Sequence, residues 1–132
     1  MGSTGAYLET GGFKEQGWKE AGSMYGVKVL KKKIKGNEKQ SLPPFSNTPG
    51  TAYILLSPDG GFKQFCQYGE DRRLEFVIDY GRHGGAEPTV HIHRYEKGKR
   101  QDEPEIIASK EKGILNQALY NKFKKFLKGV DL

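Results

Sequence analysis

Three histidines and one aspartate, residue types suited to proton transfer near neutral pH, lie close together in the chain: Asp79, His83, His91 and His93. Histidine has an ordinary pKa of about 6.5, so it can donate or accept a proton under physiological conditions. A carboxylate can orient an imidazole by accepting a hydrogen bond from one of its ring nitrogens. We therefore take these four residues as the candidate catalytic set.

Cleavage of RNA through its 2′-hydroxyl is one reaction that such a set could perform. It needs a base, an acid and a cation to neutralise the phosphate, but no metal and no cofactor. One of His91 or His83 would be the base and the other imidazole the acid, while Asp79 would orient an imidazole. Arg82 or Arg100 would bind the phosphate.

Further side chains near this stretch are candidates for binding the substrate. Lys99 lies next to Arg100, and Tyr95 follows the last histidine in the same predicted strand. A second interpretation uses the same histidines as metal ligands. The pattern His91-x-His93 on one strand face, with a third ligand, can bind zinc, nickel or iron.

The two strands expected to carry these residues show an alternation of apolar and polar side chains. Successive side chains of a strand point to opposite faces of a sheet. One face is predicted to meet a helix and the core: Phe76, Ile78, Val90 and Ile92. The opposite face, expected to be open, then holds Asp79, His91 and His93. Counting from the loop near Gly85 pairs Asp79 with His91, and Val77 with His93.

The remaining patterns predict an α+β fold. Short strands at 53–56 and 62–68, and a possible one at 106–107, extend the pair into an antiparallel meander of four to five strands. Apolar residues at helical spacing over 115–130 predict a C-terminal amphipathic helix that packs on one face. A short N-terminal helix is expected within residues 13–22, followed by a basic strand or helix extension at 27–35.

The length of 132 residues indicates one domain overall. Within it we expect a flexible N-terminus over residues 1–12. A basic arm, with the short helix and a Pro-rich loop, covers residues 13–50. The compact α+β core covers residues 51–132.

Charge and cysteine content narrow the possible partners and the compartment. The formal net charge is +6, and lysines gather in residues 14–40 and 112–130, which suits RNA or another anionic partner. Cys66 is the only cysteine, so the chain has no internal disulfide. We expect this residue in the core and the protein in the cytoplasm. No apolar stretch approaches the length of a membrane span, and the start lacks an apolar signal core.

Half of the chain resembles small domains of bacterial polymorphic toxins and of phage head-region proteins. The resemblance rests on the motifs Ser57-Pro58-Asp59-Gly60, Tyr68-Gly69-Glu70-Asp71, Ile78-Asp79-Tyr80-Gly81-Arg82-His83, His91-Ile92-His93 and Gly98-Lys99-Arg100. Some of those domains are placed with the barnase, EndoU, colicin and RelE class of metal-independent RNases. The resemblance implies a site at Asp79, His83, His91 and His93, without a role for each residue.

The leading hypothesis is thus a metal-independent RNase-like nuclease domain of phage or toxin origin, with RNA as substrate and an acidic immunity protein as a possible partner. The main alternative is a non-catalytic phage or mobile-element protein that binds nucleic acid or a protein, such as a phage structural protein. A His-x-His metal-binding domain is the third hypothesis.

Overall fold

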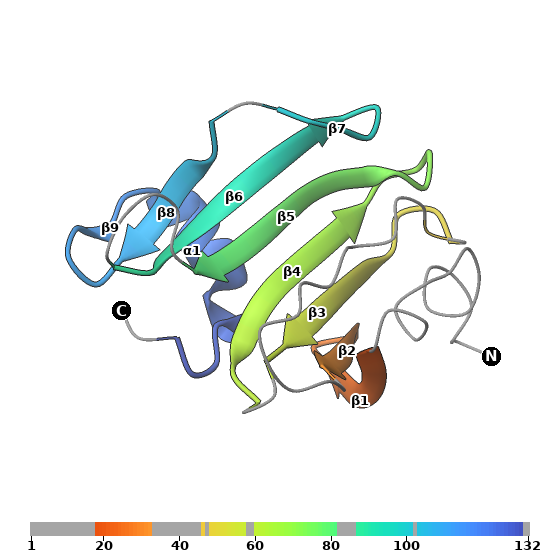
Figure 1. Ribbon diagram of the computed structural model, residues 1–132, viewed down its shortest axis with the longest axis horizontal. Coiled ribbons are helices and arrows are strands. Elements are labelled where there is room, and N and C mark those ends of the chain that lie inside the picture. Colours follow the sequence, from red (N-terminus) through yellow and green to blue (C-terminus); the bar gives the residue numbers. More distant parts are fainter. Residues whose placement is uncertain are drawn as a thin grey trace.

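The computed structural model describes residues 18–32, 46, 48–57, 60–81, 87–101 and 103–130. This part of the chain forms one twisted sheet with a short helix behind it (Figure 1). Its strands are β1 (Trp18–Met24), β2 (Val27–Lys32), β3 (Ala52–Leu56), β4 (Phe62–Tyr68), β5 (Leu74–Gly81), β6 (Thr89–Glu96), β7 (Lys99–Arg100), β8 (Glu105–Ser109) and β9 (Gly113–Ile114). The helices are α1 (Gln117–Phe123) and the 3-10 turn η2 (Lys124–Phe126).

The strands follow the order β1-β2-β3-β4-β5-β6-β8-β9, and β7 pairs with the end of β6. All described pairs are antiparallel except β2 and β3, which run parallel, so the sheet is mixed. Residues 33–51 connect these two strands, and parallel neighbours need a long connection of this kind. The antiparallel meander predicted from the sequence is therefore confirmed from β3 onward, while the prediction of four to five strands is wrong.

The predicted N-terminal helix is also wrong over the residues that the structure describes, because residues 18–24 form β1. This strand pairs with β2 through a turn at Tyr25 and Gly26, whose φ angles are 51° and 80°. Two positive φ values match the turn that suits the twist of a hairpin. Gly22, with a φ of 113°, lies at a shift in the β1–β2 register, so it serves as a bulge. Residues 13–17 lie outside the described residues.

The C-terminal helix is confirmed but is shorter than predicted. Asn116 caps α1, since its side chain accepts a hydrogen bond from the Leu119 amide at 3.0 Å. After η2 the backbone carbonyl of Lys128 accepts a hydrogen bond from the Phe62 amide at 2.8 Å, which ties this end to β4. Leu115, expected on the apolar face, is 53% exposed. Among the described residues, no helix is long and apolar enough to cross a membrane.

Buried side chains lie on both faces of the sheet. The helix-covered face carries the four residues predicted to face the core, packed with the aromatic side chains of the C-terminal segment: Phe76, Ile78, Val90, Ile92, Phe123 and Phe126. The opposite face carries a second buried cluster: Leu30, Tyr53, Leu55, Cys66, Tyr68, Leu74 and Val77. Cys66 is in the core as predicted, but the face expected to be open is largely buried.

Candidate functional site

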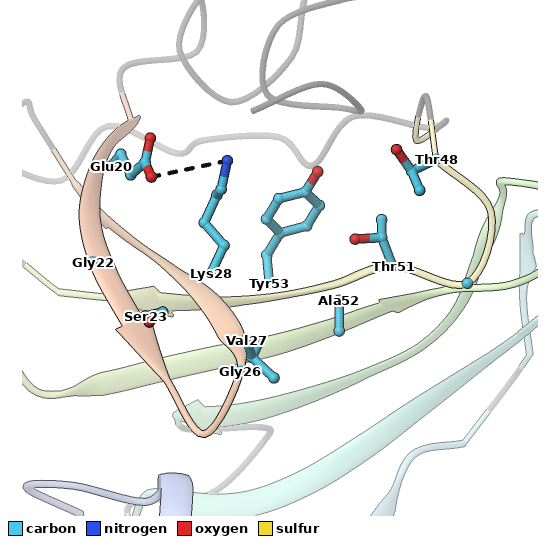
Figure 2. A pocket seen from close by; sticks show the side chains of 11 residues that line it. Glu20, Gly22, Ser23, Gly26, Val27, Lys28, Thr48, Thr51, Ala52 and Tyr53 are labelled. Atoms are coloured by element: carbon cyan, nitrogen blue, oxygen red, sulfur yellow. Dashed lines mark ion pairs between the residues drawn. The ribbon is translucent and has the colours of Figure 1, made fainter. Parts of the chain in front are cut away.

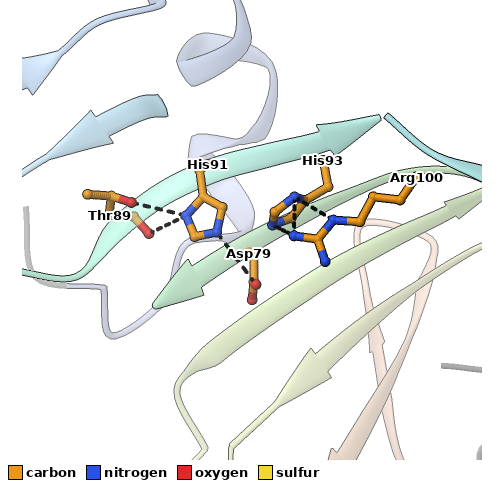
Figure 3. A network of polar contacts seen from close by, with 5 residues as sticks. All are labelled: Asp79, Thr89, His91, His93 and Arg100. Atoms are coloured by element: carbon orange, nitrogen blue, oxygen red, sulfur yellow. Dashed lines mark hydrogen bonds and ion pairs between the residues drawn. The ribbon is translucent and has the colours of Figure 1, made fainter. Parts of the chain in front are cut away.

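β5 and β6 position the predicted residues in the register expected from the sequence. Asp79 pairs with His91, Val77 pairs with His93, and Gly81 pairs with Thr89. Paired residues on neighbouring strands point to the same face of a sheet. The aspartate and both histidines, drawn in Figure 3, therefore share the face that also carries Cys66 and Val77. This confirms the predicted pairing.

The imidazole of His91 is almost fully buried, with 2% of the residue exposed. Its Nδ1 lies 3.0 Å from the Thr89 hydroxyl and 3.3 Å from the Thr89 carbonyl, while its Nε2 lies 3.6 Å from Oδ2 of Asp79 (Figure 3). In a neutral ring the hydroxyl can donate to Nδ1. In a protonated ring, Nδ1–H donates to the oxygens of Thr89. In both of these states a proton on Nε2 faces the carboxylate, whereas a neutral ring that donates Nδ1–H to the Thr89 carbonyl has a lone pair on Nε2.

The imidazole of His93 has a cation as its neighbour. Its Nδ1 accepts a hydrogen bond from Nε of Arg100 at 3.1 Å and lies 2.7 Å from Nη2 of the same guanidinium. Nη2 is also 3.0 Å from Nε2 of the ring. Because arginine only donates hydrogen bonds, Nδ1 of His93 must carry a lone pair. Arg100 reaches this position from β7, where it pairs with Tyr95.

The two imidazoles and the carboxylate form one compact cluster. The ring centroids of His91 and His93 are 4.9 Å apart and the rings are nearly perpendicular, at 84°. Burial raises the pKa of Asp79, but the contact with His91 and the charges of Lys63 and His93 outweigh it and hold this pKa below its ordinary value. Asp79 is thus ionised at neutral pH.

The other predicted site residues lie outside this cluster or outside the described residues. Arg82 and His83 lie outside the described residues. Lys99 is exposed on β7. Tyr95 is half-buried against the second core cluster, and desolvation raises its pKa despite the charge of Arg100. Of the predicted set, the described part of the chain therefore brings together Asp79, His91, His93 and Arg100.

Two residues near the cluster were not identified from the sequence patterns. Thr89 holds His91, and its position two residues earlier on the same strand face is a signal that could have revealed it. Lys63 acts on Asp79 through its charge, but only the β4–β5 pairing brings these two residues together.

Burial, followed by the charge of Asp79, raises the pKa of the Cys66 thiol. This thiol stays protonated and is no candidate nucleophile.

The same three side chains could also hold a metal ion. One ligand atom from each of Asp79, His91 and His93 lies within 4.8 Å of the others. Two imidazoles and a carboxylate suit zinc or iron, and the Thr89 carbonyl next to Nδ1 of His91 is the type of partner that fixes a ligating histidine. Arg100 opposes this use, because its cation lies against both nitrogens of His93.

A cavity of about 780 Å³ lies on the same sheet face at the other edge (Figure 2). The side chains of Glu20, Lys28 and Tyr53 point into it, and Lys28 forms a 4.0 Å ion pair with Glu20. Lys28 pairs with Tyr53, and Tyr53 pairs with Cys66. The buried Cys66 and Val77 therefore separate this cavity from His93 along one row of the sheet.

Comparisons with protein-family models, with curated proteins and with solved structures found no match to this chain.

Proposed function

We propose that Asp79, His91, His93 and Arg100 form a general acid–base site that cleaves RNA without a metal. One observation carries this proposal: the two imidazoles, 4.9 Å apart, have opposite neighbours. Nε2 of His91 faces a carboxylate, whereas Nδ1 of His93 accepts a hydrogen bond from a guanidinium. Titratable groups whose environments favour different protonation states are suited to be acid and base.

The division of roles follows from these neighbours. His93 is the base that accepts the proton of a ribose 2′-hydroxyl, whose oxygen then attacks the adjacent phosphorus. His91, acting in its imidazolium form, is the acid that gives a proton to the departing 5′-oxygen as the bond between phosphorus and that oxygen breaks, and it is left as the neutral ring. Asp79 orients the His91 ring through its contact with Nε2. The products are a 2′,3′-cyclic phosphate and a 5′-hydroxyl end.

Access to the imidazoles depends on Arg100. His93 is only 5% exposed, whereas the Arg100 residue is exposed. A phosphate binds a guanidinium through two parallel hydrogen bonds, more strongly than a neutral imidazole can. A bound phosphodiester therefore draws Arg100 from the ring, and this uncovers Nδ1 of His93. Arg100 thus has two partners in turn, His93 before binding and the phosphate afterwards.

The test is incubation of labelled total RNA and tRNA in EDTA with the protein and with the His91→Ala, His93→Ala double variant. Discrete products with the wild type alone are expected. Arg100→Ala should also lose cleavage, while Arg94→Ala, which removes a matched cation that pairs with Glu105 at 2.9 Å, should retain it. Intact RNA with the folded wild type would overturn the proposal and favour a non-catalytic protein that binds nucleic acid or a partner protein.

A second candidate function, metal binding, rests on the 4.8 Å grouping of the three ligand atoms. It makes the opposite prediction for Arg100, since removing this cation should strengthen binding of Zn²⁺. Calorimetric titration of the metal-free wild type and Arg100→Ala variant measures this directly. Absence of Zn²⁺ binding in both proteins would exclude the metal site, whereas cleavage that EDTA abolishes would favour it over the acid–base site.

A further inference from the structure

The turn between β1 and β2 presents an exposed aromatic ring. Tyr25 is 67% exposed, although it is a large and partly apolar side chain. Its φ of 51° lies in the left-handed region, which favours glycine or asparagine over tyrosine. The hairpin would therefore form more readily with another residue here. The backbone conformation therefore does not explain the tyrosine at this position, and the explanation must lie in its side chain.

A basic side chain of η2 lies over this ring. Nζ of Lys125 lies 4.9 Å from the centroid of the Tyr25 ring, within the range of a cation–π contact. The Tyr25 ring also meets Phe126 edge-on, with the centroids 5.8 Å apart. Because Phe126 is buried in the core, this contact fixes the direction of the tyrosine ring.

A hollow of about 310 Å³ lies beside the ring, at the lower end of the roughly 300–1,000 Å³ range of ligand pockets. Its described lining holds three lysines and no acidic residue: Met24, Tyr25, Lys124, Lys125, Leu127 and Lys128. A second hollow of about 350 Å³ shares Lys125 with it and adds Lys122, together with one carboxylate, Glu75. The two hollows therefore adjoin at Lys125 of η2.

We infer that Tyr25, Lys124, Lys125 and Lys128, here called the Tyr25 surface, bind single-stranded nucleic acid. A base stacks on the exposed tyrosine ring, and the lysines contact the phosphates on either side of it. Proteins that bind single strands combine these two elements, an aromatic ring for stacking and cations that follow the backbone. Three of the six described lining residues are lysines and none is acidic, which favours a polyanionic strand as the occupant.

This inference does not rest on the proposed nuclease activity. The Tyr25 surface adjoins Phe126 on the helix-covered side of the sheet, whereas Asp79, His91 and His93 lie on the opposite face. If both proposals hold, the Tyr25 surface binds a part of the RNA strand that is distant from the cleaved bond. If cleavage fails, binding at this surface is still expected.

The test is fluorescence anisotropy with a labelled oligo-deoxythymidine strand, which lacks the 2′-hydroxyl and so reports binding without cleavage. Tyr25→Asn removes the ring but suits the left-handed turn, and should weaken binding by roughly fivefold to a hundredfold. Tyr25→Phe keeps the ring and should bind like the wild type. The triple variant Lys124→Gln, Lys125→Gln, Lys128→Gln should reduce the slope of log affinity against log salt by about 2.

A matched triple variant, Lys97→Gln, Lys110→Gln, Lys112→Gln, removes the same charge elsewhere and should retain a slope near that of the wild type. Equal effects of the two triple variants would overturn the inference, since they would show that only net charge matters. Unchanged binding by Tyr25→Asn would also overturn it. So would binding of phosphatidylserine vesicles without binding of the oligonucleotide, which would identify this surface as one for anionic lipid.

Discussion

Nδ1 of His93 lies 2.7 Å from Nη2 of Arg100, so a buried imidazole nitrogen accepts hydrogen bonds from a side chain that is always cationic. Together with the hydrogen bond from Nε of Arg100 to Nδ1 at 3.1 Å, this relationship favours the tautomer with the proton on Nε2. We predict that the ¹⁵N signal of Nδ1 in His93 is that of a bare nitrogen at neutral pH. In the Arg100→Ala variant the ring should sample both tautomers and this signal should shift. The Arg94→Ala variant should leave it unchanged, and a protonated Nδ1 in the wild type would contradict the assignment.

Asp79 should make the stability of the protein depend on acid pH. Despite desolvation, His91, Lys63 and His93 lower its pKa in the folded state, so the folded protein binds fewer protons at this carboxyl than the unfolded chain does. Its stabilising contribution is present above about pH 4 and is lost as the pH falls through the folded pKa. We predict that, as the pH falls below about 4, the Asp79→Asn variant loses less of its free energy of unfolding than the wild type does, as measured by urea denaturation. An equal loss in both proteins would contradict this.

The aromatic contacts of Phe123 should account for much of the packing of α1 on the sheet. Its ring lies 5.1 Å from that of Phe65 and 5.8 Å from that of Phe76. Phe123→Ala should lower the free energy of unfolding by about 3–5 kcal/mol, because it leaves a cavity between these rings. Leu115→Ala, which truncates an exposed residue on the same predicted apolar face, should cost less than about 0.5 kcal/mol. Equal losses in urea denaturation would contradict the observed packing.

Asn116 connects the start of α1 to β8. Its side-chain oxygen accepts from the Leu119 amide, and its Nδ2 donates to Glu105 at 2.6 Å. This hydrogen bond, together with that from Arg94, lowers the pKa of Glu105. Asn116→Ala should cost about 1 kcal/mol and raise the pKa of Glu105, as followed by carboxyl NMR. Asn116→Asp should retain the cap but also raise that pKa, because it replaces the donor with a second carboxylate.

The alternation of apolar and polar side chains along each strand was sufficient to predict the β5–β6 pair. A period of two separates Ile78 and Ile92 from Asp79 and His91, and a short loop leaves few registers that keep the apolar residues on one face. The same reasoning could not place β1, where glycines and charged residues follow no clear period and the hairpin turn relies on a tyrosine with positive φ. Two-residue strands such as β7 are too short for any periodicity.

The burial of the histidines could not be predicted from one strand pair. Whether a face is covered depends on residues far apart in the chain, such as Leu30 and Tyr53, which reach the second cluster only through the parallel β2–β3 pairing. Arg100 was predicted near the site, but as a ligand for phosphate. Its contact with His93 arises because β7 folds back on β6.

The bulge at Gly22 has a consequence for how the protein behaves at high concentration. β1 is an edge strand of the described sheet, and a regular edge can pair with the edge of another molecule. At Gly22 the φ of 113° and the shift in register interrupt the regular ladder. A Cβ at this position would meet no atom within 4 Å, so only the backbone conformation demands glycine. Valine here would favour a straight edge, and the hairpin would then be open to intermolecular strand pairing and aggregation.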